Sequence, residues 1–288
     1  MQNASKFRDK IGRGQVCLGS FITCTDPTIT EALCSVSDFV WIDMEHNALS
    51  LETVQAHLMA TKGSDTAGLV RVPWNDAALI KPVLDIGADG VIVPMVRTAN
   101  EARQAVAACR YPPDGIRGYG PRRAAGYGRL TGPDFCRLAN ESIIIVVQIE
   151  HIDAVHNLDE ILAVPGLTSI VIGPFDLAGS MGFTAQPNHP EVLSALETIV
   201  AKTRKTTVWA GISVGGAPEV QPVSRHEPRA RRAPGCRVLH AFERRFRDEF
   251  TPIHRAAAEQ EAHVRAHVVR VGVDRAGRAD EHVPVGDR

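Results

Sequence analysis

Polar residues that could bind or transform a substrate follow a strongly apolar segment in the middle of the chain. Residues 143–150 read I-I-I-V-V-Q-I-E, which is typical of a parallel strand buried on both faces. Side chains alternate along a strand, so Gln148 and Glu150 leave its end on the same side. In open α/β sheets and in barrels, sites form at the carboxyl ends of the strands. Taken alone, the segment is equally consistent with a solvated loop after a strand.

Similar polar groups follow other apolar runs. The motif D-M-E-H ends in Glu45 and His46, L-V-R-V-P contains Arg71, and G-P-F-D-L contains Asp176. Asp85 lies in a helical pattern, L-D-I-G-A-D-G. A barrel would gather the strand-end groups above its core. Carboxylates, an amide, an arginine and a histidine from separate strands therefore indicate a binding or catalytic site.

The elements that must position these groups alternate from residue 17 to about residue 213. Strands are predicted at Cys17–Thr23, Phe39–Met44, Gly68–Val72, Gly90–Pro94, Ile143–Glu150, Ser169–Gly173 and Val208–Ser213. Helices are predicted at Pro27–Ser35, Leu51–Lys62, Asp76–Ile86, Thr98–Cys109, Asp153–Leu162 and Pro190–Lys205, and Tyr111–Asn140 is predicted to be a long loop. Alternation without a Gly-rich dinucleotide turn after the first strand favours an α/β (β/α)8 barrel of the TIM type over a Rossmann sheet.

The bulk composition limits the partners and the compartment. The 288 residues carry a formal net charge of −1, so no nucleic-acid partner is expected. No apolar run reaches the roughly 18 residues of a membrane span, and the first residues lack the apolar core of a secretory signal. The six cysteines include no C-x-x-C pair, which is typical of reduced thiols. We therefore expect a cytoplasmic protein with no membrane partner.

Taken together, the motifs resemble those of the HpcH/HpaI aldolase family. In chain order they are D-M-E-H, L-V-R-V-P, L-D-I-G-A-D-G, R-Y-P-P-D-G-I-R-G, G-P-R-R-A, V-Q-I-E and G-P-F-D-L-A-G-S-M-G. These are class II, metal-dependent pyruvate aldolases that include the 2-dehydro-3-deoxyglucarate and 4-hydroxy-2-oxoheptanedioate aldolases. The resemblance implies a carbon–carbon lyase of carbohydrate-acid or aromatic catabolism. Such an enzyme cleaves a 4-hydroxy-2-oxo acid or a 2-dehydro-3-deoxy sugar acid into pyruvate and an aldehyde, through a metal-stabilised enolate.

The resemblance also implies roles for individual residues. Glu150 and Asp176 would ligate a divalent metal; two carboxylates suit Mg²⁺ or Mn²⁺, and Co²⁺ would also serve. Arg71 would stabilise the enolate oxygen. His46 would take the proton of the 4-hydroxyl group, with Asp85 raising its basicity.

Further residues are expected to bind the substrate. Gln148 would donate or accept a hydrogen bond, and the backbone N–H groups of residues 173–176, which include Gly173, Pro174 and Phe175, would hold the pyruvate carboxylate. Phe175 stands where the family often has a small residue, so only its backbone could serve. The loop arginines (117, 122 and 123) would bind a second carboxylate or a phosphate, or contact another subunit. A homo-oligomer is expected, a hexamer in the family.

The family pattern ends near residue 220. Residues 221–288 contain 14 Arg and no Lys. We predict a catalytic barrel domain over 1–220 and an atypical Arg-, Ala- and His-rich segment over 221–288, either poorly ordered or produced by a reading-frame shift. The last strand and helix of the barrel would be missing or altered, with Val238–Phe242 and Val268–Val273 as substitute strands. Open sheet edges would result, and the hexamer would be in doubt.

Two alternative functions stay open at this point. One is an enzyme like the citryl- and malyl-CoA lyases of the wider superfamily, although the chain has no dedicated motif for the phosphates of an acyl-CoA. The other is a catalytically defective barrel that only binds an oxo acid and a metal.

Overall fold

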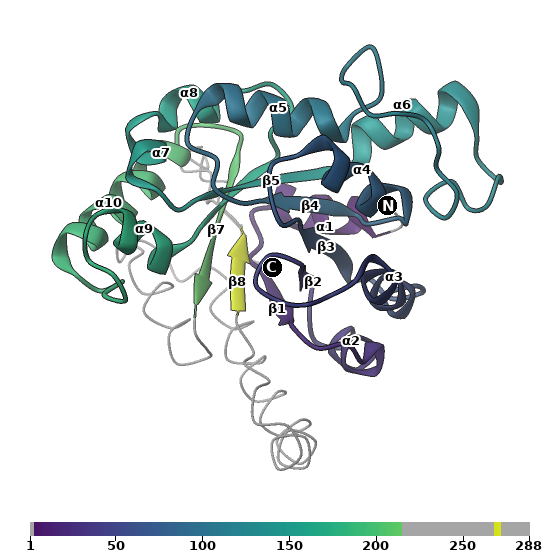
Figure 1. Cartoon of the computed structure of the whole chain (residues 1–288), viewed down its shortest axis with the longest axis horizontal. Helices are drawn as coiled ribbons and strands as arrows, with labels where there is room; N and C mark the ends of the chain where they lie inside the picture. The colour runs from purple at the N-terminus through teal and green to yellow at the C-terminus, as the bar shows by residue number, and fades with distance from the viewer. Residues whose placement is uncertain (1–2, 215–267, 272–288) are drawn as a thin grey trace, which may run out of the picture.

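The computed structural model describes residues 3–214 and 268–271 (Figure 1). Its strands are β1 (Cys17–Ile22), β2 (Phe39–Asp43), β3 (Ala67–Arg71), β4 (Gly90–Val93), β5 (Ile144–Ile149), β6 (Ser169–Ile172), β7 (Trp209–Val214) and β8 (Val268–Val271). Its helices are α1 (Ala4–Gly12), α2 (Pro27–Leu33), α3 (Leu51–Ala60), α4 (Ala77–Asp85), α5 (Ala99–Cys109), α6 (Gly132–Ser142), α7 (Ile152–His156), α8 (Leu158–Leu162), α9 (Pro174–Ser180) and α10 (Pro190–Thr203). No helix in these ranges is long and apolar enough to cross a membrane.

The seven predicted strands are confirmed. Each neighbouring pair from β1 to β7 is parallel, as expected of strands that alternate with helices. Because all seven run in the same direction, their carboxyl ends lie at one end of the sheet. The architecture is thus α/β and consistent with a TIM-like barrel.

The closing strand differs from that of a regular (β/α)8 barrel. β8 pairs with both β1 and β7 and closes the ring, but it is antiparallel to each of them. The expected open edges on β1 and β7 are therefore covered. The short run that begins at Val268 is the strand, whereas Val238–Phe242 and the rest of residues 221–288 lie outside the described residues.

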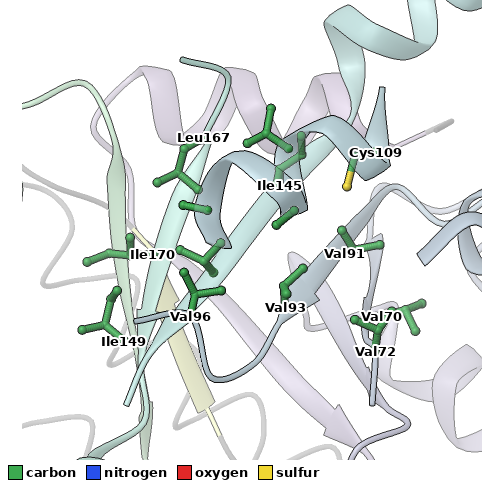
Figure 2. Packing of buried hydrophobic residues seen from close by; sticks show 14 of the residues in the cluster. Val70, Val72, Val91, Val93, Val96, Cys109, Ile145, Ile149, Leu167 and Ile170 are labelled. Carbon is green, nitrogen blue, oxygen red and sulfur yellow. The ribbon is translucent and has the colours of Figure 1, made fainter. Parts of the chain in front are cut away.

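The sheet is buried on both faces, which explains its continuous apolar runs. Outward-facing residues such as Val91, Ile145 and Ile170 pack against the surrounding helices (Figure 2). Inward-facing residues such as Ile144 and Val171 fill the barrel. Strands that are apolar on both faces are typical of parallel sheets covered by helices.

Helix α1 was not predicted, although its apolar residues recur at helical spacing. Ala4, Phe7 and Ile11 are buried and belong to the same cluster as the side chains inside the barrel. The ring of Phe7 meets that of Phe39 edge-on, with centroids 5.4 Å apart. The helix therefore covers the amino-terminal end of the barrel, opposite the strand ends that carry the polar motifs.

The other differences concern helices. The starts of the helices predicted from Leu51 and from Thr98 are confirmed: Ser50 and Thr98 cap them with their side chains, and Thr98 forms a capping box with Glu101. The segment predicted as a loop over Tyr111–Asn140 contains most of α6, which begins at Gly132. The helix predicted over 153–162 is divided at Asn157 into α7 and α8.

Candidate active site

Arg71 is the centre of a buried polar cluster at the carboxyl ends of β2, β3 and β5. Its Nε donates a hydrogen bond of 2.7 Å to Oδ1 of Asp43, which is its partner in the β2–β3 register. Its Nη1 lies 2.9 Å from Oε2 of Glu45 in an ion pair and donates to Oε1 of Gln148 at 3.3 Å. The guanidinium is thus held by three side chains from the ends of β2 and β5, two strands that do not pair with each other.

Glu150 continues this cluster from the end of β5. Gln148 Nε2 donates to Glu150 Oε2 at 2.6 Å, as expected for side chains on one face of a strand. The other oxygen, Oε1, accepts the backbone N–H of Met95 at 2.7 Å. Met95 adopts a left-handed backbone conformation with φ of 55°, which is uncommon for a residue with a side chain. This conformation supports the carboxylate from the loop after β4.

Gly173 allows β6 to approach this carboxylate closely. A Cβ atom at Gly173 would lie 2.7 Å from Glu150 Oε2 and 3.0 Å from its Cβ. Any larger residue at this position would therefore clash with the side chain of Glu150.

Asp176 and Phe175 occupy the first turn of α9, directly after β6. Both are exposed, and the charge of Asp176 raises the pKa of Glu150. Gly173 donates its N–H to the carbonyl of Ile149, and Pro174 has no N–H. Of the four backbone groups predicted to bind a carboxylate, only those of Phe175 and Asp176 are therefore still candidates as donors.

The site accumulates negative charge. Burial, with smaller contributions from the charges of Glu45 and Asp176, raises the pKa of Glu150 to about 7, although the Met95 N–H and Arg71 lower it. Burial also raises the pKa of Glu45, although the charges of Arg71 and His46 lower it. Burial is the largest single effect on Asp43 and would raise its pKa. The hydrogen bond and charge of Arg71, with the Glu45 N–H and the charge of His46, together outweigh burial, so the pKa of Asp43 is lowered.

His46 lies at the rim of the cluster. Its side chain is 63% exposed, and its Nε2 is 3.8 Å from Glu45 Oε2. Asp85 instead accepts a hydrogen bond of 2.7 Å from Nη2 of Arg117. Within residues 3–214, no hydrogen bond or ion pair joins His46 to Asp85. Support of His46 by Asp85 stays a prediction, whereas Glu45 is the carboxylate that lies beside it.

The loop arginines have different surroundings. Arg117 is buried, pairs with Asp85 and lies over the ring of Tyr111 at 4.5 Å. Arg123 donates to the carbonyls of Ile86 and Leu58. Both side chains therefore fasten the loop to the barrel, and of the three only Arg122 is exposed.

The donor set fits a hard divalent cation. In the described part of the chain, no group of three or more His, Cys, Asp or Glu could alone hold a metal. Glu150 and Asp176 would supply two oxygen ligands, and substrate and water oxygens would complete the shell. Glu45 Oε2 is buried and has no hydrogen-bond partner among the residues described. A cation would offset this concentration of carboxylates.

Sequence reasoning assigned no role to Asp43, Glu45 or Met95. Asp43 and Glu45 lie in the D-M-E-H motif, and the parity of β2 places Asp43 on the inward face, so a signal for these two existed. Met95 had no such signal, because its contribution is a backbone N–H in a rare conformation.

The raised pKa of Glu150 predicts how the stability of the metal-free protein depends on pH. The folded state holds a proton on this carboxyl up to about pH 7, whereas the ordinary value is 4.5. Its contribution to stability is therefore complete below pH 4.5 and is lost as pH rises through 7. The loss is roughly 3 kcal/mol.

Urea unfolding with EDTA at pH 5 and pH 8 tests this prediction. The free energy of unfolding of Glu150→Gln minus that of wild type should be larger at pH 8 than at pH 5, because glutamine does not ionise. Saturating Mg²⁺ should remove this advantage at pH 8. A difference between the two proteins that does not change with pH would contradict the prediction.

Known proteins have sequences and structures similar to those of this chain. Residues 18–217 match the HpcH/HpaI aldolase/citrate lyase family. The chain is 41% identical over 215 residues to the 4-hydroxy-2-oxo-heptane-1,7-dioate aldolase of Salmonella paratyphi A, covering 74% of this chain and 80% of that protein. The protein of the same name from Salmonella typhimurium is 40% identical over the same shares of the two chains.

Solved structures support the same assignment. The HpcH/HpaI aldolase from Desulfitobacterium hafniense DCB-2 has a TM-score of 0.70 at 29% identity, over 76% of this chain and 86% of that one. An HpcH/HpaI aldolase/citrate lyase family protein from Burkholderia cenocepacia J2315 has a TM-score of 0.73 at 28% identity, over 85% and 99%. With the family match over most of its length and the polar cluster at the strand ends, the chain belongs to the HpcH/HpaI aldolase/citrate lyase family.

Proposed function

We propose that the chain cleaves a 4-hydroxy-2-oxo acid or a 2-dehydro-3-deoxy sugar acid into pyruvate and an aldehyde. Its family and its named relatives make it an aldolase, a carbon–carbon lyase that depends on a divalent metal. The substrate class and the residue roles are our proposal. The observation that carries it is the hydrogen-bonded series Arg71–Gln148–Glu150 at the carboxyl ends of the strands.

Arg71 has the position and charge that the reaction requires. Cleavage of the C3–C4 bond leaves an electron pair on the pyruvate fragment, which is held as an enolate. Arg71 would donate hydrogen bonds to the enolate oxygen, where negative charge grows in the transition state. Gln148 accepts from Arg71 and donates to Glu150, so it would orient both groups toward the substrate.

Glu150 and Asp176 would hold the divalent metal, for which we propose Mg²⁺ or Mn²⁺, with Co²⁺ as a substitute. When bound, the metal would act as a Lewis acid on the 2-oxo group of the substrate. The N–H groups of Phe175 and Asp176 lie in the first turn of α9 and have no intrahelical acceptor, so they would bind the pyruvate carboxylate.

His46 is proposed as the base that removes the proton from the 4-hydroxyl group. It is partly exposed, as a group that exchanges protons with solvent must be. Glu45, whose Oε2 lies 3.8 Å from Nε2 of His46, is placed to orient the imidazole ring. The ion pair with Arg117 uses Oδ1 of Asp85, so any action of Asp85 on His46 would use the other oxygen, Oδ2.

Pyruvate release from 4-hydroxy-2-oxo acids tests the proposed function. We expect release with Mg²⁺ or Mn²⁺, its loss with excess EDTA, and its recovery when either metal is added back. A lactate dehydrogenase assay measures the product directly. The oxo acids tested should include 4-hydroxy-2-oxoheptanedioate and 2-dehydro-3-deoxyglucarate. A citryl- or malyl-CoA should be tested separately for release of acetyl-CoA, because its cleavage gives no pyruvate. Folded protein that releases no pyruvate from any free oxo acid would contradict the proposal, and cleavage of the CoA esters alone would favour the lyase alternative.

A homo-oligomer, with the hexamer as the expected form, and a cytoplasmic location remain predictions. Light scattering on purified protein measures the first.

A further inference from the structure

The guanidinium of Arg71 lies over two aromatic rings inside the barrel. Its Cζ is 5.2 Å from the centre of the Trp41 ring and 5.9 Å from that of Phe21. The two rings stack on each other, with centroids 4.5 Å apart and planes at 21°. Phe21 and Trp41 are partners in the β1–β2 register. They form a layer directly below that of Asp43 and Arg71, which are partners in the β2–β3 register.

The indole N–H of Trp41 gives no reason for a tryptophan at this buried position. The side chain is 1% exposed, and its Nε1–H has no hydrogen-bond partner among the described residues. A buried unpaired N–H is unfavourable, so an aliphatic side chain would avoid a cost that tryptophan incurs. The face of the indole offers a compensating contact, because a guanidinium within about 6 Å of the ring is attracted to it. This attraction is strongest where water is excluded.

We propose that the stacked Phe21–Trp41 pair is a positioning device for Arg71. The inference rests on the proposed function, in which Arg71 binds the enolate oxygen. Asp43 and Gln148 hold the guanidinium through its N–H groups and Glu45 through an ion pair, and a substrate oxygen must compete with them for the guanidinium. The attraction of the charge to the rings needs no carboxylate or amide acceptor. It therefore holds Arg71 in place while the hydrogen bonds of its N–H groups are exchanged.

Substitution of Trp41 tests this role. We expect Trp41→Leu to lower kcat roughly tenfold per folded molecule, because the cation–π contact is lost in a buried site. The affinity for Mn²⁺, measured by calorimetry, should change less than about threefold, since neither Glu150 nor Asp176 is altered. Trp41→Phe keeps an aromatic face and should retain kcat to within about threefold.

Phe39→Leu is the matched control. Phe39 lies on the same strand and the same inward face, is equally buried, and contacts Phe7 rather than Arg71. It should lose stability like Trp41→Leu but keep kcat per folded molecule. Equal loss of kcat in the two leucine variants, or no loss in Trp41→Leu, would overturn the inference.

A spectroscopic readout separates this inference from the proposed function. The chain has three tryptophans, so Trp74→Phe and Trp209→Phe together leave Trp41 as the only tryptophan, which is excited selectively over the tyrosines. In that background the emission should change when Arg71 is replaced by lysine and when Mg²⁺ and pyruvate are added. If no substrate is cleaved, the proposed function fails, and the effect of Arg71→Lys on the emission still decides whether the ring contact exists. An unchanged emission would refute the contact even in an active enzyme.

Discussion

Replacing Glu150 with glutamine is expected to weaken Mn²⁺ binding by about a hundredfold or more and to abolish metal-dependent pyruvate release. A neutral amide is a much poorer ligand than a carboxylate for a hard cation. The amide also cannot accept from both Met95 N–H and Gln148 Nε2 as the two carboxylate oxygens do. Either bond must break or the side chain must turn, so the remaining ligand atom would be misplaced. Calorimetry with Mn²⁺ and the pyruvate assay measure the two effects.

Glu160→Gln is the control for this substitution. It makes the same chemical change on the exposed surface of α8, away from the site. It should leave both metal affinity and turnover at wild-type values. The metal assignment is wrong if Glu150→Gln binds Mn²⁺ within about threefold of wild type while remaining folded.

Replacing Arg71 with lysine is expected to lower kcat about a hundredfold to a thousandfold, the range seen when an oxyanion donor is lost. Lysine keeps the positive charge, so Asp43 and Glu45 would not be left as unpaired buried acids. It loses the planar arrangement of donors that contacts Asp43 and Gln148 at the same time. Metal affinity should change only a few-fold, which distinguishes this effect from that of Glu150→Gln.

Arg137→Lys provides the comparison for Arg71→Lys. Arg137 is 64% exposed, and its ion pairs with described residues are to Asp134 and Glu141 of its own helix. Its replacement should leave kcat unchanged. If Arg71→Lys retains kcat within about threefold, the oxyanion role of Arg71 is refuted, because the ammonium group would then serve as well as the guanidinium.

Local patterns in the sequence were sufficient for the seven parallel strands. Apolar runs such as residues 143–147 must be buried on both faces, and the helical patterns between them leave only parallel pairing with crossovers. The same patterns predicted that Gln148 and Glu150 would share a face, and their 2.6 Å hydrogen bond confirms it. Strand parity depends on neighbouring residues alone, which is why it can be inferred without a structure.

Contacts between distant segments could not be inferred in this way. The antiparallel direction of β8 depends on how residues after 214 return to β1 and β7, and no local signal encodes that direction. The ion pair of Asp85 also joins residues far apart in the sequence, because Arg117 lies in a separate loop. Residues 215–267 and 272–288 lie outside the structural description, so the predicted reading-frame shift stays a hypothesis.

The sequence by itself determined which residue types stand at the strand ends, and thereby the family and the chemistry open to it. Only the tertiary structure decided how those residues combine: Arg71 held by Asp43, Glu45 and Gln148, and Glu150 held by the backbone of Met95. It also revealed the aromatic layer beneath Arg71. The physical reason is that periodicity fixes the face on which a side chain lies, whereas hydrogen bonds, ion pairs and ring contacts require the register between strands and the approach of loops.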